Sequence, residues 1–158
     1  MSIEILQSLK YQKQNRFEFY FLDNADIKYR VLTVNLPRES FEYTKTKAGE
    51  NTLTGITFPD TVTLSILETK DFYLEDFVES WRDVFYDKDT RIFKSLPVEN
   101  ADKKTGVLVL FDEKGLINRT YIYNNLSLVG LSESTFDYGN PDLLSWELVM
   151  KVEDVSRI

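Results

Sequence analysis

One stretch of this chain changes period, and this change limits the possible folds more than any other feature. In "DFYLEDFVESWRDVFYD" (71–87) the apolar residues recur on one helix face: Leu74, Phe77, Val78, Trp81, Val84 and Phe85. The other patterned segments mostly alternate apolar and polar residues, which is the period of a strand. The sequence therefore predicts an α+β fold that is mainly β. One long amphipathic helix, capped by Asp71, packs on about seven or eight antiparallel strands in a sandwich or half-barrel.

The expected strands are placed by their alternation and by the turns between them. Residues 17–21 and 27–37 are predicted to form a first hairpin, closed by Pro37. Further strands are expected at 61–68, 106–112, 115–131 and 143–155, with a charged irregular loop at 88–105. Residues 1–14 are expected to form an N-terminal arm with a short helix capped by Ser2, and residues 1–158 a single domain.

The segment "RESFEYTKTKAGENTLTGITFP" (38–59) has a different character. Phe41 and Tyr43 share one strand face with Lys45 and Lys47, and "AGEN" then turns the chain back. A two-stranded hairpin with so few apolar residues buries little and is marginally stable alone in water. We expect the rest of the domain or a neighbouring chain to cover the hairpin at 38–58.

Composition excludes several classes of function. The chain has 158 residues, 42% of them hydrophobic, and a net charge of -7 without a basic cluster in the sequence. Proteins that grip nucleic acid phosphates need clustered cations, so such binding is disfavoured. The absence of Cys and His removes disulfides, thiolate nucleophiles, imidazole triads and the usual zinc sites. With neither a signal peptide nor a membrane span, we expect a soluble protein made in a cytoplasm.

Acidic residues form two groups that could hold a metal ion or act as catalytic carboxylates. Asp137, Asp142 and Glu147 lack the spacing of a calcium loop, so a turn with solvated carboxylates is expected. The second group lies on the polar face of the expected helix, where solvated charge is usual: Glu75, Asp76, Glu79 and Asp83. Neither group predicts a metal ion or an acid–base pair.

Aromatic residues and glycines give no stronger signal for a ligand. Tyr121 and Tyr123, with Arg119, could stack bases, but positive charge does not surround them in the sequence. The six glycines are scattered and match neither a phosphate-binding loop nor a dinucleotide motif. We therefore expect no cofactor and no enzymatic activity.

The order of these parts resembles a known family. A short N-terminal helix precedes "NRFEFYF" (15–21), a strand ends in "VNLP" (34–37), and the hairpin at 38–58 follows. Then come "TVTLSILE" (61–68), the helix "FVESWRDVFYD" (77–87), a turn at Gly139-Asn140-Pro141 and "LSWELVMKVEDV" (144–155). This set is similar to the tail tube protein of contractile-tailed bacteriophages of the T-even-like type. Inner tubes of type VI secretion and extracellular contractile injection particles are more distant relatives.

The resemblance implies a structural subunit of a virion tail, assembled in the host cytoplasm. Six subunits would form a ring, and stacked rings would form a tube whose strands close a continuous barrel around a lumen. DNA would pass through the lumen without specific binding, because an acidic wall repels phosphates. The partners implied are further copies of the chain, the contractile sheath, and baseplate and tail-terminator proteins.

The resemblance also assigns roles to residues. Residues 72–86 would pack outside the barrel toward the sheath, held by a helix-to-sheet core: Leu74, Phe77, Val78, Trp81, Phe85, Trp146, Leu148 and Met150. Contact between rings falls to the hairpin tip: Lys45, Lys47, Glu50 and Asn51. One alternative of the same fold is a baseplate tube-initiator or terminator ring. Another, from a different class, is a monomeric binding module or an enzyme that uses carboxylates and tyrosines.

Overall fold

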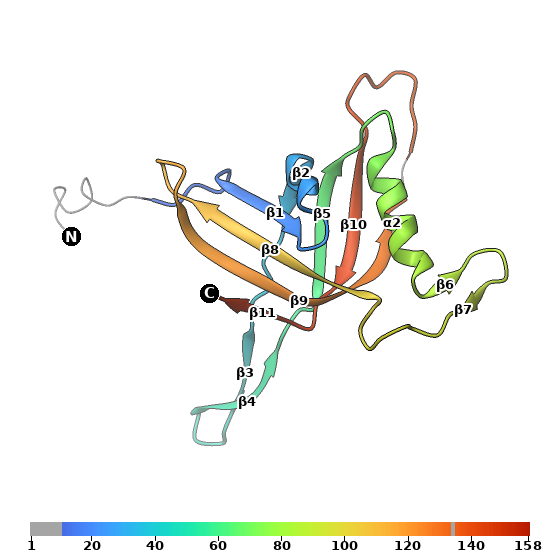
Figure 1. The fold of residues 1–158 in the computed structure, drawn as a ribbon. Coiled ribbons are helices and arrows are strands. Elements are labelled where there is room, and N and C mark those ends of the chain that lie inside the picture. Colours follow the sequence, from blue (N-terminus) through green and yellow to red (C-terminus); the bar gives the residue numbers. More distant parts are fainter. Residues whose placement is uncertain (1–10, 134) are drawn as a thin grey trace.

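A curled antiparallel sheet dominates the computed structural model, which describes residues 11–133 and 135–158 (Figure 1). The elements in chain order are β1 (Phe17–Phe21), the 3-10 helix η1 (Ala25–Tyr29), β2 (Val31–Val34), β3 (Ser40–Lys45), β4 (Asn51–Thr57), β5 (Thr61–Leu67), α2 (Tyr73–Asp83), β6 (Tyr86–Asp87), β7 (Ile92–Phe93), β8 (Lys103–Phe111), β9 (Ile117–Leu131), β10 (Ser145–Lys151) and β11 (Asp154–Arg157). The mainly β fold with one long helix, predicted from the periods, is confirmed.

The sheet runs in the order β1-β8-β9-β10-β5-β2, and β11 also pairs with β9. Strand β9 is its centre, since it pairs with β8 along one edge and with β10 and then β11 along the other. Two positive-φ residues, Asn125 (53°) and Gly130 (148°), lie in β9 close to shifts in its register. Such irregularities bend a strand, and here they help the sheet to curl.

The predicted hairpin of residues 17–21 and 27–37 is wrong. β1 pairs with β8, and β2 pairs with β5, so these two strands form opposite edges of the sheet. Between them the chain forms η1, in which Ile27 is fully buried and Tyr29 is largely exposed. The alternation of Ile27, Tyr29 and Val31 suggested a strand, but burial of Ile27 in the core favours a tight helical turn here.

The predicted last strand, 143–155, is interrupted. It begins at Ser145, ends as β10 at Lys151 and resumes as β11 on the same edge of β9. At the break the Val152 N–H donates to the Asp60 carbonyl at 2.7 Å, and the Glu153 N–H to the Asn124 carbonyl at 3.1 Å. Val152 stays buried, so the apolar alternation continues through a break that the pattern could not reveal.

Helix α2 is shorter than predicted and has a different cap. Phe72, in the left-handed region at φ 54°, takes the N-cap position in place of Asp71 and makes no side-chain capping hydrogen bond. Glu68 supplies the cap instead, because its carboxylate accepts the N–H of Leu74 at 3.1 Å and of Glu75 at 3.2 Å. Asp71 accepts a hydrogen bond from the Thr69 hydroxyl, which is the main reason why its pKa lies below the ordinary value.

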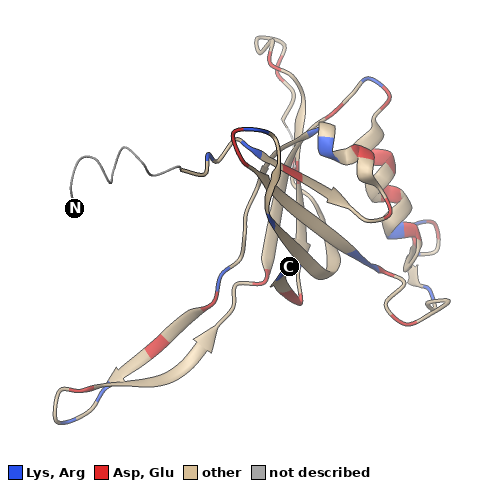
Figure 2. Ribbon diagram, turned by 60° about the vertical axis from the view of Figure 1, so that its left-hand side comes forward, with Lys and Arg blue, Asp and Glu red and all other residues tan. Residues whose placement is uncertain are grey.

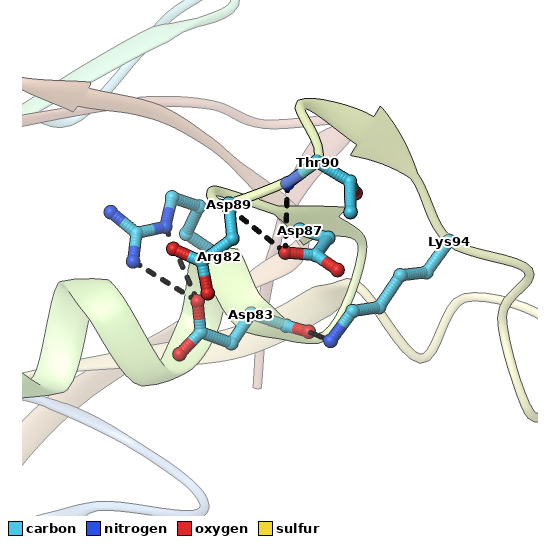
Figure 3. A network of polar contacts seen from close by, with 6 residues as sticks. All are labelled: Arg82, Asp83, Asp87, Asp89, Thr90 and Lys94. Atoms are coloured by element: carbon cyan, nitrogen blue, oxygen red, sulfur yellow. Dashed lines mark hydrogen bonds and ion pairs between the residues drawn. The ribbon is translucent and has the colours of Figure 1, made fainter.

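The charged loop 88–105 is more ordered than its composition suggested (Figure 3). β6 and β7 form a small hairpin, in which the Asp87 carboxylate accepts the N–H of Asp89 at 3.0 Å. The Lys94 ammonium donates to the Asp83 carbonyl at 2.9 Å and so satisfies one of the free carbonyls at the end of α2. The hairpin thus continues directly from the helix, in place of the extra helical turn that was predicted.

The core lies between the inner face of the sheet and α2. Phe21 of β1 packs against two aromatic side chains of α2. The centre of its ring lies 5.4 Å from that of Phe77 and 5.8 Å from that of Trp81. The Trp81 indole N–H also donates to the Asp102 carbonyl at 2.7 Å, which ties the segment before β8 to the helix. The residues assigned to the helix-to-sheet core lie here: Leu74, Val78, Trp81, Leu148 and Met150 are buried, and Phe77, Phe85 and Trp146 are partly buried against them.

Candidate assembly surfaces

The hairpin of β3 and β4 projects away from the sheet (Figures 1 and 2). It carries exposed apolar side chains. Phe41 pairs with Ile56 across the two strands, and Tyr43 pairs with Leu53. These four residues, the hairpin stripe, are between 53% and 62% exposed. The sequence suggested a mainly polar hairpin, so this stripe is a feature that reading the sequence missed.

A register shift keeps the hairpin stripe on one face. Glu42 pairs with Gly55 and Tyr43 with Leu53, so β4 has one extra residue at this point. The shift keeps Ile56 and Leu53 opposite two side chains of the same face of β3. The Thr57 hydroxyl donates to the Glu42 carboxylate at 2.6 Å, which links the strands at the base of the hairpin.

The tip of the hairpin is polar and solvent-exposed. Lys45 pairs with Asn51, and the Thr46 N–H closes the turn on the Glu50 carbonyl at 2.8 Å. Gly49 has a φ of 84°, a conformation that side chains disfavour. Lys45, Lys47 and Glu50 form no ion pair with any residue of the described ranges. Their charges therefore remain open to another molecule.

Three arginines from distant parts of the sequence gather at the base of the hairpin, around a groove of about 410 Å³. Arg38 precedes β3, Arg119 lies on β9 and Arg157 ends β11. Their gathering corrects the expectation that the protein lacks a basic cluster, and only the pairing of β9 with β11 reveals it. We call this surface, with its glutamate Glu39, the arginine groove.

Tyr121 lies at the wall of the arginine groove, with its ring largely buried. Hydrogen bonding from Arg119, together with Arg38, holds the pKa of Tyr121 below its usual value, although burial opposes the shift. Tyr123 lies in the core, where burial raises its pKa, and its hydroxyl donates to the Asn35 carbonyl at 2.8 Å. The two tyrosines therefore do not form a shared stacking platform.

The connection between β9 and β10 is the acidic counterpart of this groove. Residues 132–147 contain no Lys or Arg and four carboxylates, Glu133, Asp137, Asp142 and Glu147, which line an open cleft of about 560 Å³. Within segment 135–144 three large side chains are strongly exposed: Phe136, Tyr138 and Leu143. The Asp137 carboxylate accepts the N–H of Gly139 at 2.9 Å, so this segment is a hydrogen-bonded turn.

The two edge strands of the sheet are also open. A groove of about 960 Å³ lies between them, lined by Phe17 of β1, Val31 and Val34 of β2, and Leu108 and Leu110 of β8. On the described part of the chain no strand pairs with the outer edge of β1 or β2. Unpaired edges are templates for pairing with another chain, so they are a second kind of assembly surface.

The described ranges contain no candidate metal centre. Residues 11–133 and 135–158 contain no group of three or more carboxylates arranged to hold a metal ion. Of the acidic residues on α2, Asp83 pairs with Arg82 at 3.0 Å. In the same ranges, no helix has both the length and the apolar character needed to cross a membrane.

Comparison of the sequence with family models and with curated proteins finds no match. Comparison of the structure with solved structures finds several matches. A chain from the sheath–tube complex of the extracellular contractile injection system PVC, in its extended state, has a TM-score of 0.63 and 15% identity, covering 100% of this chain and 98% of that chain.

Two further structures give the same result. The PVC sheath/tube terminator has a TM-score of 0.67 and 16% identity over 96% of this chain and 99% of its own. A chain of the anti-feeding prophage baseplate has a TM-score of 0.60 and 13% identity over 95% and 97%. The chain therefore has a tail-tube-like fold, as the order of its elements predicted, and it shares this fold with structural parts of contractile particles.

Proposed function

We propose that this chain is a structural, non-enzymatic tube subunit of a contractile particle. The observation that carries the proposal is the exposed hairpin stripe on a tail-tube-like fold. An apolar stripe on a projecting two-stranded hairpin is unfavourable in water, and a neighbouring subunit would bury it. The open edges of β1 and β2 fit the same role, since a barrel closed by several subunits removes free edges.

The finer parts of the proposal rest on the resemblance. Six subunits form each ring, the hairpin reaches a neighbouring ring or subunit, and Lys45, Lys47, Glu50 and Asn51 contact it there. Acidic residues recur along α2, coloured red in Figure 2, and of these Asp76 and Asp83 are exposed and available to a surrounding sheath. Passage of DNA through the lumen belongs to the bacteriophage form of this proposal and is compatible with a net charge of -7.

A terminator ring is the second candidate. The TM-score with the PVC terminator, 0.67, is slightly higher than the TM-score with the sheath–tube chain, 0.63. The two roles differ in how the purified protein associates. A terminator closes a stack with one ring, whereas a tube subunit adds ring upon ring.

Electron microscopy and light scattering of the concentrated protein test both candidates. A tube subunit gives stacked rings or tubes, and a terminator gives single rings. A protein that stays monomeric at every concentration would contradict the whole proposal.

The role of the hairpin stripe is tested with the double variant Leu53→Ser, Ile56→Ser. Both side chains lie outside the core, so the free energy of unfolding of the monomer should change by less than about 0.5 kcal/mol. Association should fall strongly, because the apolar area that drives it is lost. Leu116→Ser with Ile117→Ser is the matched control, since these residues are similarly exposed at the start of β9. Equal losses in both variants would show that the stripe has no particular role.

A further inference from the structure

The arginine groove contains cations without an acidic partner. Arg38, Arg119 and Arg157 form no salt bridge with any carboxylate of the described residues. Arg38 donates weakly to the Tyr121 hydroxyl, at 3.5 Å, and lies 5.5 Å from the centre of its ring. With Glu39 included, three positive and one negative side chain give the groove a net charge of +2. In a chain of net charge -7, such a concentration of unpaired guanidinium groups indicates a site for an anion.

The floor of the groove limits what this anion can be. Leu36, Pro37, Phe58 and Val155 line it together with the arginines. A ligand that fits must therefore present anionic groups beside apolar groups. A bare phosphate would satisfy the arginines and leave the apolar floor in contact with water.

Segment 135–144 offers this combination. Asp137 and Asp142 supply carboxylates, and the exposed side chains of Phe136, Tyr138 and Leu143 supply apolar surface. The Asp142 carboxylate accepts no hydrogen bond within the described chain, and the turn of the segment is already formed by the Asp137 and Asn140 side chains. Little conformational entropy would be lost on docking a turn that is already ordered.

The two surfaces lie on different parts of the molecule. In Figures 1 and 2 the β9–β10 connection projects from the end opposite the β3–β4 hairpin, whose base forms the groove. One molecule therefore cannot join its own two surfaces, but two copies can. A contact between different patches at opposite ends repeats in one direction and builds a stack.

We infer that segment 135–144 of one copy docks into the arginine groove of the next copy, with Asp137 and Asp142 facing Arg119 and Arg157. The docked copy then lies alongside the projecting hairpin and covers the hairpin stripe. This inference rests on the proposed function, since it names the surfaces by which subunits of successive rings meet.

A charge-reversal experiment on the full chain tests this contact. Two variants are made, Arg119→Glu with Arg157→Glu, and Asp137→Lys with Asp142→Lys. Circular dichroism and thermal unfolding establish that each remains folded, which is expected because all four side chains are exposed. Each variant alone should need at least about tenfold more protein to stack, because like charges now meet.

Mixing the two variants in equal amounts provides the decisive measurement. Each variant then meets a partner of opposite charge at both surfaces, so stacks of alternating variants should return. Sedimentation velocity and electron microscopy measure the recovery. Normal stacking by either variant alone, or no recovery on mixing, would overturn the inference while the wild-type stacks still support the proposed function. Wild-type protein that never associates would instead overturn the proposed function itself.

A labelled single-stranded oligonucleotide distinguishes nucleic acid from a second copy as the occupant. If a second copy is the occupant, fluorescence anisotropy should detect equally weak binding to the wild type and to the Arg119→Glu, Arg157→Glu variant. Tight wild-type binding that this variant loses, with its stacking unchanged, would assign the groove to nucleic acid phosphates and overturn the inference.

Discussion

Gly106 on β8 is the glycine with the least room for a side chain. A Cβ atom there would lie 2.6 Å from the Phe19 Cζ and 2.9 Å from the Leu126 Cδ1, both in the core. We expect Gly106→Ala to lower the free energy of unfolding by about 1–3 kcal/mol, because two packed side chains must move. Urea unfolding of the variant and the wild type measures this change in the free energy of unfolding. Gly139→Ala, whose Cβ would meet only the Asp137 Oδ1 at 3.5 Å, is the control and should be nearly neutral.

Asp112 organises the turn between β8 and β9. Its carboxylate accepts the N–H groups of Leu116 and Lys114, both at 2.9 Å, and these bonds hold its pKa below the ordinary 3.8. The ionised form therefore stabilises the folded state above pH 3.8, and this contribution is lost as the pH falls through the lower, folded-state pKa.

The Asp112→Ala variant should thus lose less of its own stability than the wild type as the pH is lowered from about 5. Chemical unfolding at a series of pH values measures this difference in slope. Glu99→Ala, which removes an exposed carboxylate without backbone hydrogen bonds to it, is the control. Parallel pH profiles for Asp112→Ala and the wild type would contradict the role of the turn.

The sequence predicted which residues of the helix are buried, but it did not predict which distant residues lie together. The helical period placed Leu74, Val78 and Trp81 on one face, and these residues are buried, because a period reports directly on burial. The clustering of Arg38, Arg119 and Arg157 had no such signal. Their positions are far apart in the chain, and only strand pairing brings them together.

At the scale of elements, α2 depends on a cap that lies outside the sequence pattern. Glu68 directly follows β5, six residues before Leu74, and its carboxylate accepts hydrogen bonds from the first turn of the helix. We expect Glu68→Ala to lower the free energy of unfolding by about 1 kcal/mol, because two N–H groups of the first turn lose their acceptor. Asp71→Ala should cost less, and urea unfolding of both variants measures the difference. A larger loss for Asp71→Ala would restore Asp71 as the cap.

The sequence pattern predicted correctly where several strands lie, but it did not predict which strands pair. Alternation located β1, β5 and β9, since each has one face in the core. It gave no information on partners, and two strands close in sequence, β1 and β2, were wrongly paired. The exposed faces of β3 and β4 are outside the reach of the same reasoning, because a pattern cannot distinguish an apolar face that meets its own core from one that meets another molecule.

For the whole molecule, the two tryptophans report on one core from different sides. Trp81 belongs to the buried core and holds α2 to the sheet, and Trp146 on β10 packs against the same core. We expect the monomer to unfold in one cooperative step. In the variants Trp81→Phe and Trp146→Phe, fluorescence of the remaining tryptophan and far-ultraviolet circular dichroism should give the same midpoint. Separate midpoints within either variant would show that α2 and the sheet unfold independently.

The placement of the hairpin and the acidic segment at opposite ends has a consequence for growth. Any filament built by joining them is directional, with a basic, hairpin-bearing terminus and an acidic, hairpin-free terminus. A factor that nucleates the filament and a factor that stops it would then need surfaces of opposite charge, and one could not replace the other. Filament direction would thus be encoded within each subunit.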